Sequence, residues 1–308
     1  MSMKTALPIR LVEPSQAVRQ ATSSRIAAFV TLTKPRIAVM VLLTVAVGYV
    51  LGARGAAHPA TMGFTLLGTG LVAAGASAWN QVIERERDGR MRRTAKRPLP
   101  AGLLQPLESA LFASILAVAG IVILLVATNP MAASVALATF VLYVAAYTPL
   151  KPITTLNTVV GAIPGALPPV IGWAAATGTV GIEAFSLFLV VFLWQFPHFL
   201  AIAWVHREDY ARGGHKMLPC IDPDGRQTAR QAVAYALVLV PAGLLPTVAG
   251  IAGGWYFAGA FAAGLYYLAA SLRFSAHRDD ASARRLMMAS FVYLPVILLL
   301  LLVNPMPA

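Results

Sequence analysis

The chain has 308 residues, of which 58% are hydrophobic and only 12% charged, whereas soluble domains carry about 25% charged residues. This composition excludes an ordinary soluble domain, and the long continuous apolar runs exclude a membrane β-barrel, whose strands alternate apolar and polar residues. The single cysteine, Cys220, excludes an internal disulfide and a cysteine-based metal site. The net charge of +12 would suit a nucleic-acid-binding protein, unless the cations have another explanation.

Residues 1–25 are polar, and no apolar run follows their first charges, so they are not predicted to be a cleavable signal peptide. We interpret them as a flexible cytoplasmic tail, followed by a single transmembrane domain at 26–308. Crossing a bilayer requires about 20 apolar residues. Nine segments meet this requirement: 36–54, 61–80, 106–128, 130–147, 156–176, 182–205, 229–249, 251–273 and 284–303.

The fifth segment is predicted to be a kinked or broken helix. It is interrupted by glycines and prolines, namely Gly161, Pro164, Gly165, Pro168 and Pro169. Proline removes a backbone donor from a helix, and the freed carbonyls must be satisfied by neighbouring helices or a cavity. The predicted fold is therefore an all-α polytopic membrane bundle.

The Lys and Arg residues explain the orientation. With nine spans, all of them except Arg54 fall in the tail or in the connections after spans two, four, six and eight. The positive-inside rule places those connections and the N-terminus in the cytoplasm and the C-terminus outside, as in a protein of the bacterial inner membrane. Topology therefore accounts for the positive charge, and nucleic acid is not expected as a partner.

Polar residues are scarce within the spans and concentrate in the cytoplasmic connections. A transporter is expected to place polar groups near the middle of the bilayer, accessible from both sides. The distribution favours an enzyme whose site opens to the cytoplasm.

Three polar residues end the second span at intervals of four: Asn80, Glu84 and Asp88. On a helix each step of four turns the side chain by only about 40°, so the three oxygens face one side. Such oxygens suit Mg²⁺, which commonly shares its coordination with substrate phosphates. Arg93 and Arg97 follow at the same interval and are candidates to bind those phosphates. The alternative is a solvated helix end whose charges pair with one another.

Two further basic clusters lie on the cytoplasmic side. Lys34 and Arg36 precede the first span, and Lys151 ends the block Y-T-P-L-K that begins at Tyr147. A lone cation at the end of a span is expected to have a partner, and a diphosphate would serve. The alternatives are an interfacial anchor for the first cluster and a topology marker for the second. Pro149 leaves it open whether the second block is helical.

A third cluster begins with W-Q-F-P-H-F at Trp194. Gln195 and His198 are unusual inside a membrane span, and Glu208 and Asp209 form a second acidic patch after it. A histidine within a span is a candidate functional residue. Alternatively, His198 hydrogen-bonds a carbonyl freed by the preceding proline, and the acidic patch is a solvated charge cluster.

Acidic sites and several phosphate-binding cations at the mouth of an apolar bundle fit a lipid diphosphate. The apolar tail would lie among the helices, and the head would bind through Mg²⁺, which helps the diphosphate leave. An allylic diphosphate would leave a carbocation, and nearby aromatic rings would stabilise it.

Four blocks resemble the intramembrane, UbiA-type prenyltransferase superfamily. They are N-x-x-x-E-x-x-x-D-x-x-M-x-R-T-x-x-R-P-L at 80–99, L-T-K-P-R at 32–36, Y-T-P-L-K at 147–151, and W-Q-F-P-H-F with R-E-D-Y-A-R-G-G-H-K-M-L-P at 194–219. The third cluster is similar to the haem-farnesylating branch. The resemblance implies nine transmembrane helices around a central cavity open to the cytoplasmic side. Many relatives have Asp where this chain has Glu84, and a D-x-x-x-D pair where it has His206 and Tyr210.

The implied reaction joins haem B, farnesyl diphosphate and water to give haem O and diphosphate, for haem-copper oxidase cofactor biosynthesis. Mg²⁺ is the implied cofactor, and haem B is a substrate rather than a prosthetic group. Haem A synthase or an oxidase assembly factor is an implied partner. The assigned residues are Asn80, Glu84 and Asp88 for catalysis; these three with Asp209 for Mg²⁺; Lys34, Arg36, Arg93, Arg97 and Lys151 for diphosphate; and Tyr147, Trp194, Gln195 and His198 for the haem pocket.

Two other functions fit parts of this pattern. A prenyltransferase that acts on an aromatic or quinone precursor would share the diphosphate chemistry and differ in its acceptor. A non-catalytic haem or lipid carrier would bind without turnover, and nothing in such a role requires three oxygens on one helix face.

Overall fold

The computed structural model describes residues 16–306, and the calls that concern 1–15 lie outside the described residues. Within that range the chain is helical, and its one β feature is an isolated antiparallel bridge between Ala252 and Pro305. The elements are α1 (Gln16–Leu32), α2 (Pro35–Ala53), α3 (Pro59–Asp88), α4 (Pro106–Ala127), α5 (Pro130–Val141), the π-helix η1 (Leu142–Tyr147), α6 (Thr148–Leu150), α7 (Asn157–Ala166), α8 (Pro168–Thr177), α9 (Ile182–Val205), α10 (Arg207–Arg212), α11 (Leu218–Ile221), α12 (Arg226–Ala242), α13 (Leu245–Val248), α14 (Gly254–His277) and α15 (Asp280–Val303).

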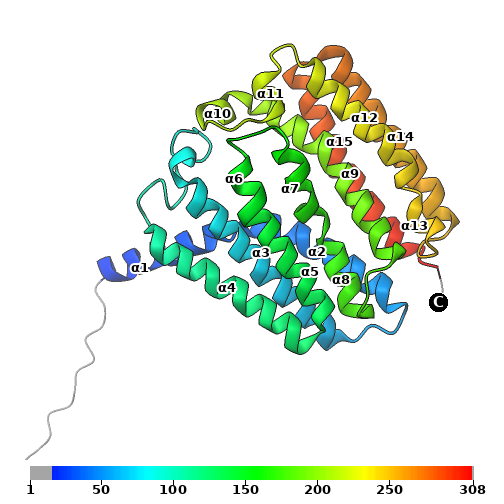
Figure 1. Cartoon of the computed structure of the whole chain (residues 1–308), viewed down its shortest axis with the longest axis horizontal. Coiled ribbons are helices and arrows are strands. Elements are labelled where there is room, and N and C mark those ends of the chain that lie inside the picture. The colour runs from blue at the N-terminus through cyan, green and yellow to red at the C-terminus, as the bar shows by residue number, and fades with distance from the viewer. Residues whose placement is uncertain (1–15, 307–308) are drawn as a thin grey trace, which may run out of the picture.

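Nine helical stretches in residues 16–306 are long and apolar enough to cross a membrane, as the sequence predicted. They cover 35–53, 59–88, 106–127, 130–150, 157–177, 182–205, 226–248, 254–277 and 280–303. Figure 1 shows them packed side by side in one bundle, with α10 and α11 at the end where α3 terminates. The predicted boundaries differ from these by a few residues, except at the end of the second span.

Helix α3 extends past the predicted span at 61–80 and reaches Asp88, as the predicted common helix face of Asn80, Glu84 and Asp88 requires. The apolar run stops near Ala78, but the helix continues to Asp88. The polar extension is therefore not a separate connection, because it is the last turns of the same helix. This continuity fixes the direction of its side chains relative to the bundle.

Proline explains where several helices start and where others break. Five helices begin at a proline, which suits the first turn because its missing N–H has no helical partner there. The fifth span is broken, as predicted: α7 ends at Ala166, and α8 begins at Pro168 after the single residue Leu167. The fourth span is continuous through Pro149, but its end is distorted into the π-helix η1.

The last ten residues of the expected tail at 1–25 are helical. Residues 16–25 belong to α1, whose C-terminal end packs onto α3. Leu32, at the end of α1, is fully buried in a cluster with Ala78 and Val82 of α3. Gln81 donates its side-chain N–H to the Leu32 carbonyl at 2.9 Å, which ties this junction to α3.

Small residues allow α2 and α8 to pack closely. A Cβ placed on Gly48 would lie 2.0 Å from the Pro169 carbonyl oxygen, and one on Gly172 would lie 2.0 Å from the Val45 oxygen. Close backbone approach at small residues is typical of helix packing in membranes. The second half of the broken fifth span, α8, therefore packs closely against the first span, α2.

The connections at one end of the bundle meet one another. Lys216 donates its backbone N–H to the Lys151 carbonyl at 2.7 Å, and Asn157 donates to the Lys216 carbonyl at 3.0 Å. Asp209 accepts the backbone N–H of Arg92 at 3.2 Å. We call this the basic end, defined by the connections 89–105, 151–156 and 206–225.

Candidate active site

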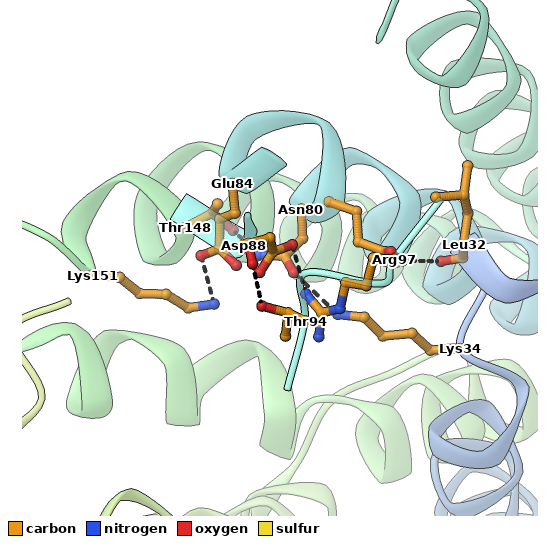
Figure 2. A network of polar contacts seen from close by, with 10 residues as sticks. Leu32, Lys34, Asn80, Glu84, Asp88, Thr94, Arg97, Thr148 and Lys151 are labelled. Atoms are coloured by element: carbon orange, nitrogen blue, oxygen red, sulfur yellow. Dashed lines mark hydrogen bonds and ion pairs between the residues drawn. The ribbon is translucent and has the colours of Figure 1, made fainter. Parts of the chain in front are cut away.

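Asn80, Glu84 and Asp88 lie together at the basic end of α3. Their side chains are turned inward, and the three residues are only 1%, 4% and 0% exposed. Figure 2 shows them in one polar network at the end of the helix. The alternative of a solvated helix end is therefore wrong for these three residues.

Each of the three residues has its own cationic partner, drawn in Figure 2. Lys34 Nζ donates to Asn80 Oδ1 (3.1 Å), Lys151 Nζ pairs with Glu84 Oε1 (2.7 Å), and Arg97 Nη1 donates to Asp88 Oδ2 (2.7 Å). The three cations are among the five residues assigned to the diphosphate. They come from the α1–α2 junction, from the end of the fourth span and from the connection after α3.

Some oxygens of the network keep free coordination capacity. Asp88 Oδ1 is buried and has no hydrogen-bond partner within the described residues. Asn80 Nδ2 donates to Thr148 Oγ1 at 3.2 Å, which turns Asn80 Oδ1 toward Lys34. A buried carboxylate oxygen without a donor is costly, so it marks a place where a cation would be stabilised.

The half-buried lysines Lys34 and Lys151 differ in their electrostatic surroundings. Burial, with the nearby Arg97 and Lys151, lowers the pKa of Lys34 to about 7. Burial also acts against the charge of Lys151, but Tyr147 and Glu84 outweigh it and hold the pKa of Lys151 above its usual range. Lys151 is therefore a permanent cation of the site.

Lys34 owes its position to a backbone turn. Its φ of 49° lies in the left-handed region, which is uncommon for a residue other than glycine. This conformation separates α1 from α2 and precedes Pro35, which starts α2. The site residue therefore carries local backbone strain, as functional positions often do.

Arg36 and Arg93, also assigned to the diphosphate, do not touch the α3 carboxylates. Arg36 is exposed. Arg93 is exposed as well, and its guanidinium carbon lies 5.2 Å from the centre of the Tyr210 ring. These two side chains are therefore exposed and lie outside the buried network.

Asp209, assigned to Mg²⁺, is not joined to Glu84 or Asp88 by any hydrogen bond or ion pair in residues 16–306. Its Oδ1 instead pairs with Arg212 at 2.5 Å and accepts the Arg92 N–H at 3.2 Å. Within the same residues, no group of three or more His, Cys, Asp or Glu side chains is arranged to hold a metal.

His198 and Trp194 lie together on α9. The rings stack with their centres 5.0 Å apart. His198 Nδ1 lies 2.7 Å from Ser290 Oγ, and Trp194 Nε1 donates to the Ser290 carbonyl at 3.0 Å. The partner of the imidazole is therefore a hydroxyl on α15 and not the carbonyl that Pro197 frees.

Gln195 and Tyr147, also assigned to the haem pocket, make no hydrogen bond with His198 in the described part of the chain. Gln195 donates to the carbonyls of Ala162 and Val191 at 3.1 and 3.2 Å, so its amide joins α9 to α7. Tyr147 packs against Gly161, and Lys151 Nζ lies 4.6 Å from the centre of its ring. Tyr147 is consequently beside the α3 network and not in the cluster around His198.

Sequence reasoning missed three residues near the network. Thr148 accepts from Asn80, and Thr94 donates to the Asp88 carbonyl at 2.7 Å. His215 is 4% exposed and its Nδ1 is buried without a partner within the described residues. Burial lowers the pKa of His215 to about 4, against a weaker opposing effect of Glu84. Thr148 and His215 lie inside blocks already singled out, but nothing in their spacing indicated these contacts.

The sequence and the fold were compared with those of known proteins. A protein named Protoheme IX farnesyltransferase, from Solibacter usitatus, is 44% identical over 285 residues, covering 90% of this chain and 98% of the relative. A solved structure of digeranylgeranylglyceryl phosphate synthase superposes with a TM-score of 0.77 at 17% identity, covering 91% of this chain and 98% of the other.

A second solved structure, a UbiA homolog from Archaeoglobus fulgidus bound to GPP and Mg²⁺, has a TM-score of 0.64 at 16% identity, covering 89% of this chain and 99% of the other. At such identities the two structures support the fold alone. The model of the UbiA prenyltransferase family matches residues 41–294. Because this match covers most of the chain and the fold agrees, the protein belongs to the UbiA prenyltransferase family and is a multi-pass membrane protein.

Proposed function

We propose that this protein transfers the farnesyl group of farnesyl diphosphate to a vinyl group of haem B, with addition of water, and releases haem O and diphosphate. The similarity to the Solibacter relative over nearly the whole of both chains supports this acceptor. The geometric observation that carries the proposal is the α3 network. Three buried oxygen-bearing side chains are each held by a cation suited to a diphosphate.

Asn80, Glu84 and Asp88 would hold Mg²⁺ through their side-chain oxygens. The donor set fits, because two carboxylates and an amide are ligands that Mg²⁺ accepts and Asp88 Oδ1 is buried without a donor. The Archaeoglobus homolog of the same fold was solved with GPP and Mg²⁺ bound, and we propose the same ion here. When bound, the ion neutralises diphosphate charge and so makes the diphosphate a better leaving group.

The cations of the network would exchange partners when substrate enters. Lys34, Arg97 and Lys151 now neutralise α3, and a diphosphate offers them more negative charge through charge-assisted hydrogen bonds. Their transfer to the diphosphate would release the α3 oxygens. Arg36 and Arg93, which are exposed, would contact the diphosphate from the solvent side.

The acceptor would be oriented from α9. Ser290 engages Nδ1 of His198 and leaves Nε2 to ligate or orient the haem iron. Trp194, stacked on His198, offers a flat apolar surface beside it. A central cavity open at the basic end, with Tyr147 and Gln195 in its wall, is part of this proposal.

In the proposed reaction the carbon–oxygen bond to the diphosphate breaks and leaves an allylic farnesyl cation. The haem vinyl group attacks this cation with its electron pair, and water adds to the cation that results. The water proton leaves with the diphosphate, so that haem B, farnesyl diphosphate and water balance haem O and protonated diphosphate. Lys34, Arg97 and Lys151 stabilise the developing charge on the diphosphate.

We also propose the setting of this activity. The basic end lies in the cytoplasm and the C-terminus outside the bacterial inner membrane, as the distribution of Lys and Arg residues indicates. The transmembrane prenyltransferase domain begins near residue 26. Haem A synthase or an oxidase assembly factor would receive haem O.

The test is mass spectrometry of haem extracted from membranes with and without this protein, together with an assay of the purified protein. The purified protein receives farnesyl diphosphate, Mg²⁺ and either haem B or an aromatic quinone precursor. Haem O is expected only in the haem arm. Prenylation of the quinone precursor alone would replace the proposed acceptor, and binding of haem without product would indicate a carrier.

A further inference from the structure

Asp209 lies where two connections of the basic end meet. It belongs to α10, after the sixth span, while Arg92 belongs to the connection after α3. Asp209 Oδ1 accepts the Arg92 backbone N–H at 3.2 Å and the guanidinium of Arg212 at 2.5 Å. One carboxylate thus joins segments that are 117 residues apart in sequence.

The surroundings of Asp209 do not fit a divalent cation. Asp209 Oδ1 already accepts hydrogen bonds from two donors, and one of these donors is the positively charged guanidinium of Arg212. The neighbouring acid, Glu208, is exposed and makes no hydrogen bond or ion pair in the described part of the chain. A Mg²⁺ ion here would have one carboxylate and an adjacent guanidinium, which repels it.

Two further contacts connect the same pair of segments. Arg93 lies over the Tyr210 ring, with 5.2 Å between its guanidinium carbon and the ring centre. Met91 is 3% exposed and packs so tightly on Gly213 that a Cβ on that glycine would lie 2.9 Å from its sulfur. The junction is therefore a built contact with a polar and an apolar part.

Each segment leads to a cation of the α3 network. The connection after α3 carries Arg97, which pairs with Asp88, and Thr94 anchors it to the Asp88 carbonyl. The segment after α10 bonds through Lys216 N–H to the carbonyl of Lys151. The junction is therefore connected to Arg97 along the chain and to Lys151 through the backbone of Lys216.

We propose that Asp209 is a positioning residue that clasps the 89–105 connection to α10, and so holds Arg97 against Asp88 of the α3 network, rather than a ligand of a second metal ion. This inference rests on the proposed function for the identity of the diphosphate. The ion pair with Arg212 and the Arg92 N–H keep the pKa of Asp209 below its usual range, so the clasp is charged at neutral pH.

The experiment uses the full chain in detergent and three variants: Asp209→Ala, Asp209→Asn and the neighbouring control Glu208→Gln. Hydrogen exchange of residues 89–97 in the free protein measures the closure of the junction. Titration with an unreactive thiodiphosphate analogue of farnesyl diphosphate, at several Mg²⁺ concentrations, measures the affinity and the Mg²⁺ requirement. Asp88→Asn supplies the signature of a lost metal ligand.

Asp209→Ala is expected to accelerate exchange at 89–97 and to weaken analogue binding about tenfold, while the half-saturating Mg²⁺ concentration stays within about twofold of wild type. Asp209→Asn keeps an acceptor for the Arg92 N–H and is expected to lie between wild type and Asp209→Ala. Glu208→Gln should match wild type in both measurements.

A raised Mg²⁺ requirement in Asp209→Ala, equal to that of Asp88→Asn and without faster exchange, would overturn the clasp and restore Asp209 as a metal ligand. The exchange measurement needs no substrate. If the wild-type protein failed to bind the analogue, the proposed function would fail while the exchange data would still decide whether Asp209 closes the junction.

Discussion

At the scale of single residues, we expect Asp88 to serve chemistry rather than stability. Asp88→Ala is expected to lower kcat/KM by at least about a hundredfold, equivalent to about 2.7 kcal/mol of transition-state stabilisation. The protein should still fold, because Arg97, the partner left behind, is 27% exposed and can be hydrated. Turnover with saturating Mg²⁺ and the apparent melting temperature in detergent are the two measurements.

The matched control for this variant is Glu86→Gln. Glu86 lies in the same helical turn, but its side chain is 75% exposed, and among residues 16–306 it pairs only with Arg85 at 3.2 Å. Such surface pairs contribute little to stability. Near-normal turnover in Asp88→Ala would remove Asp88 from the metal site.

His198 is expected to act on the acceptor alone. His198→Ala should weaken haem binding by about tenfold or more and leave Mg²⁺-dependent binding of farnesyl diphosphate unchanged. The physical reason is that the imidazole lies on α9 with Trp194 and Ser290, apart from the α3 network. Paired titrations of both substrates measure this, and an equal loss of both affinities would assign His198 a structural role.

His215 should make stability depend on pH. Burial lowers its pKa to about 4, whereas an exposed imidazole titrates near 6.5, so between these values the unfolded chain binds more protons than the folded one. The contribution of His215 is therefore complete above pH 6.5 and is lost as the pH falls toward 4. The apparent melting temperature in detergent should fall over this window, and less steeply in His215→Gln.

Burial also lowers the pKa of the half-buried His206, so that residue adds to the pH dependence of stability. The difference between the wild type and His215→Gln therefore measures the contribution of His215 alone. Identical pH profiles for the wild type and His215→Gln would show that the imidazole is hydrated in the folded protein.

At the scale of elements, the packing of α2 on α8 depends on two glycines. Gly48→Ala is expected to destabilise the protein by about 1–3 kcal/mol, because the added Cβ would meet the Pro169 carbonyl oxygen at 2.0 Å and the backbones would have to separate. Thermal unfolding in detergent measures the effect.

Gly63→Ala in α3 is the matched control, since a Cβ there has no neighbour within 4 Å. Alanine favours a helix over glycine by roughly 0.5–1 kcal/mol, so this variant should be neutral or slightly more stable. Equal effects of the two substitutions would mean that the α2–α8 crossing tolerates a wider separation.

Local sequence signals were sufficient for most elements and insufficient at their ends. The break between α7 and α8 follows from the consecutive prolines at 168 and 169. The length of α3 does not follow from hydropathy, because most of its residues after Trp79 are polar, and Asn80, Glu84 and Asp88 remain helical within a buried network. Residues 16–25 likewise looked like a tail but form a helix that continues into the buried end of α1.

At the scale of the whole molecule, the nine spans imply a fixed orientation. A reporter fused after the C-terminus should read as periplasmic, and one inserted at Gly225, between α9 and α12, should read as cytoplasmic. The reason is that, with nine spans, every Lys and Arg except Arg54 is predicted to fall on one side of the membrane. A pair of enzymatic reporters with opposite compartment requirements measures this, and the same reading at both positions would contradict the predicted topology.

The sequence by itself determined the number of spans, the broken fifth helix and the common face of Asn80, Glu84 and Asp88. These features depend on apolar length, on proline and on the turn of a helix, all of which act over a few residues. The pattern of four similar blocks also led to the family that the comparisons support.

Only the tertiary structure decided which cation meets which oxygen. Lys34 and Asn80 are 46 residues apart, and Arg92 and Asp209 are 117 apart, so no local rule relates them. The tertiary structure also shows that Tyr147 lies beside Lys151 and apart from His198, and that Asp209 pairs with Arg212 and not with a partner of the α3 carboxylates. Spacing fixes which side of a helix a residue faces, whereas its partners are set by how the helices and their connections pack.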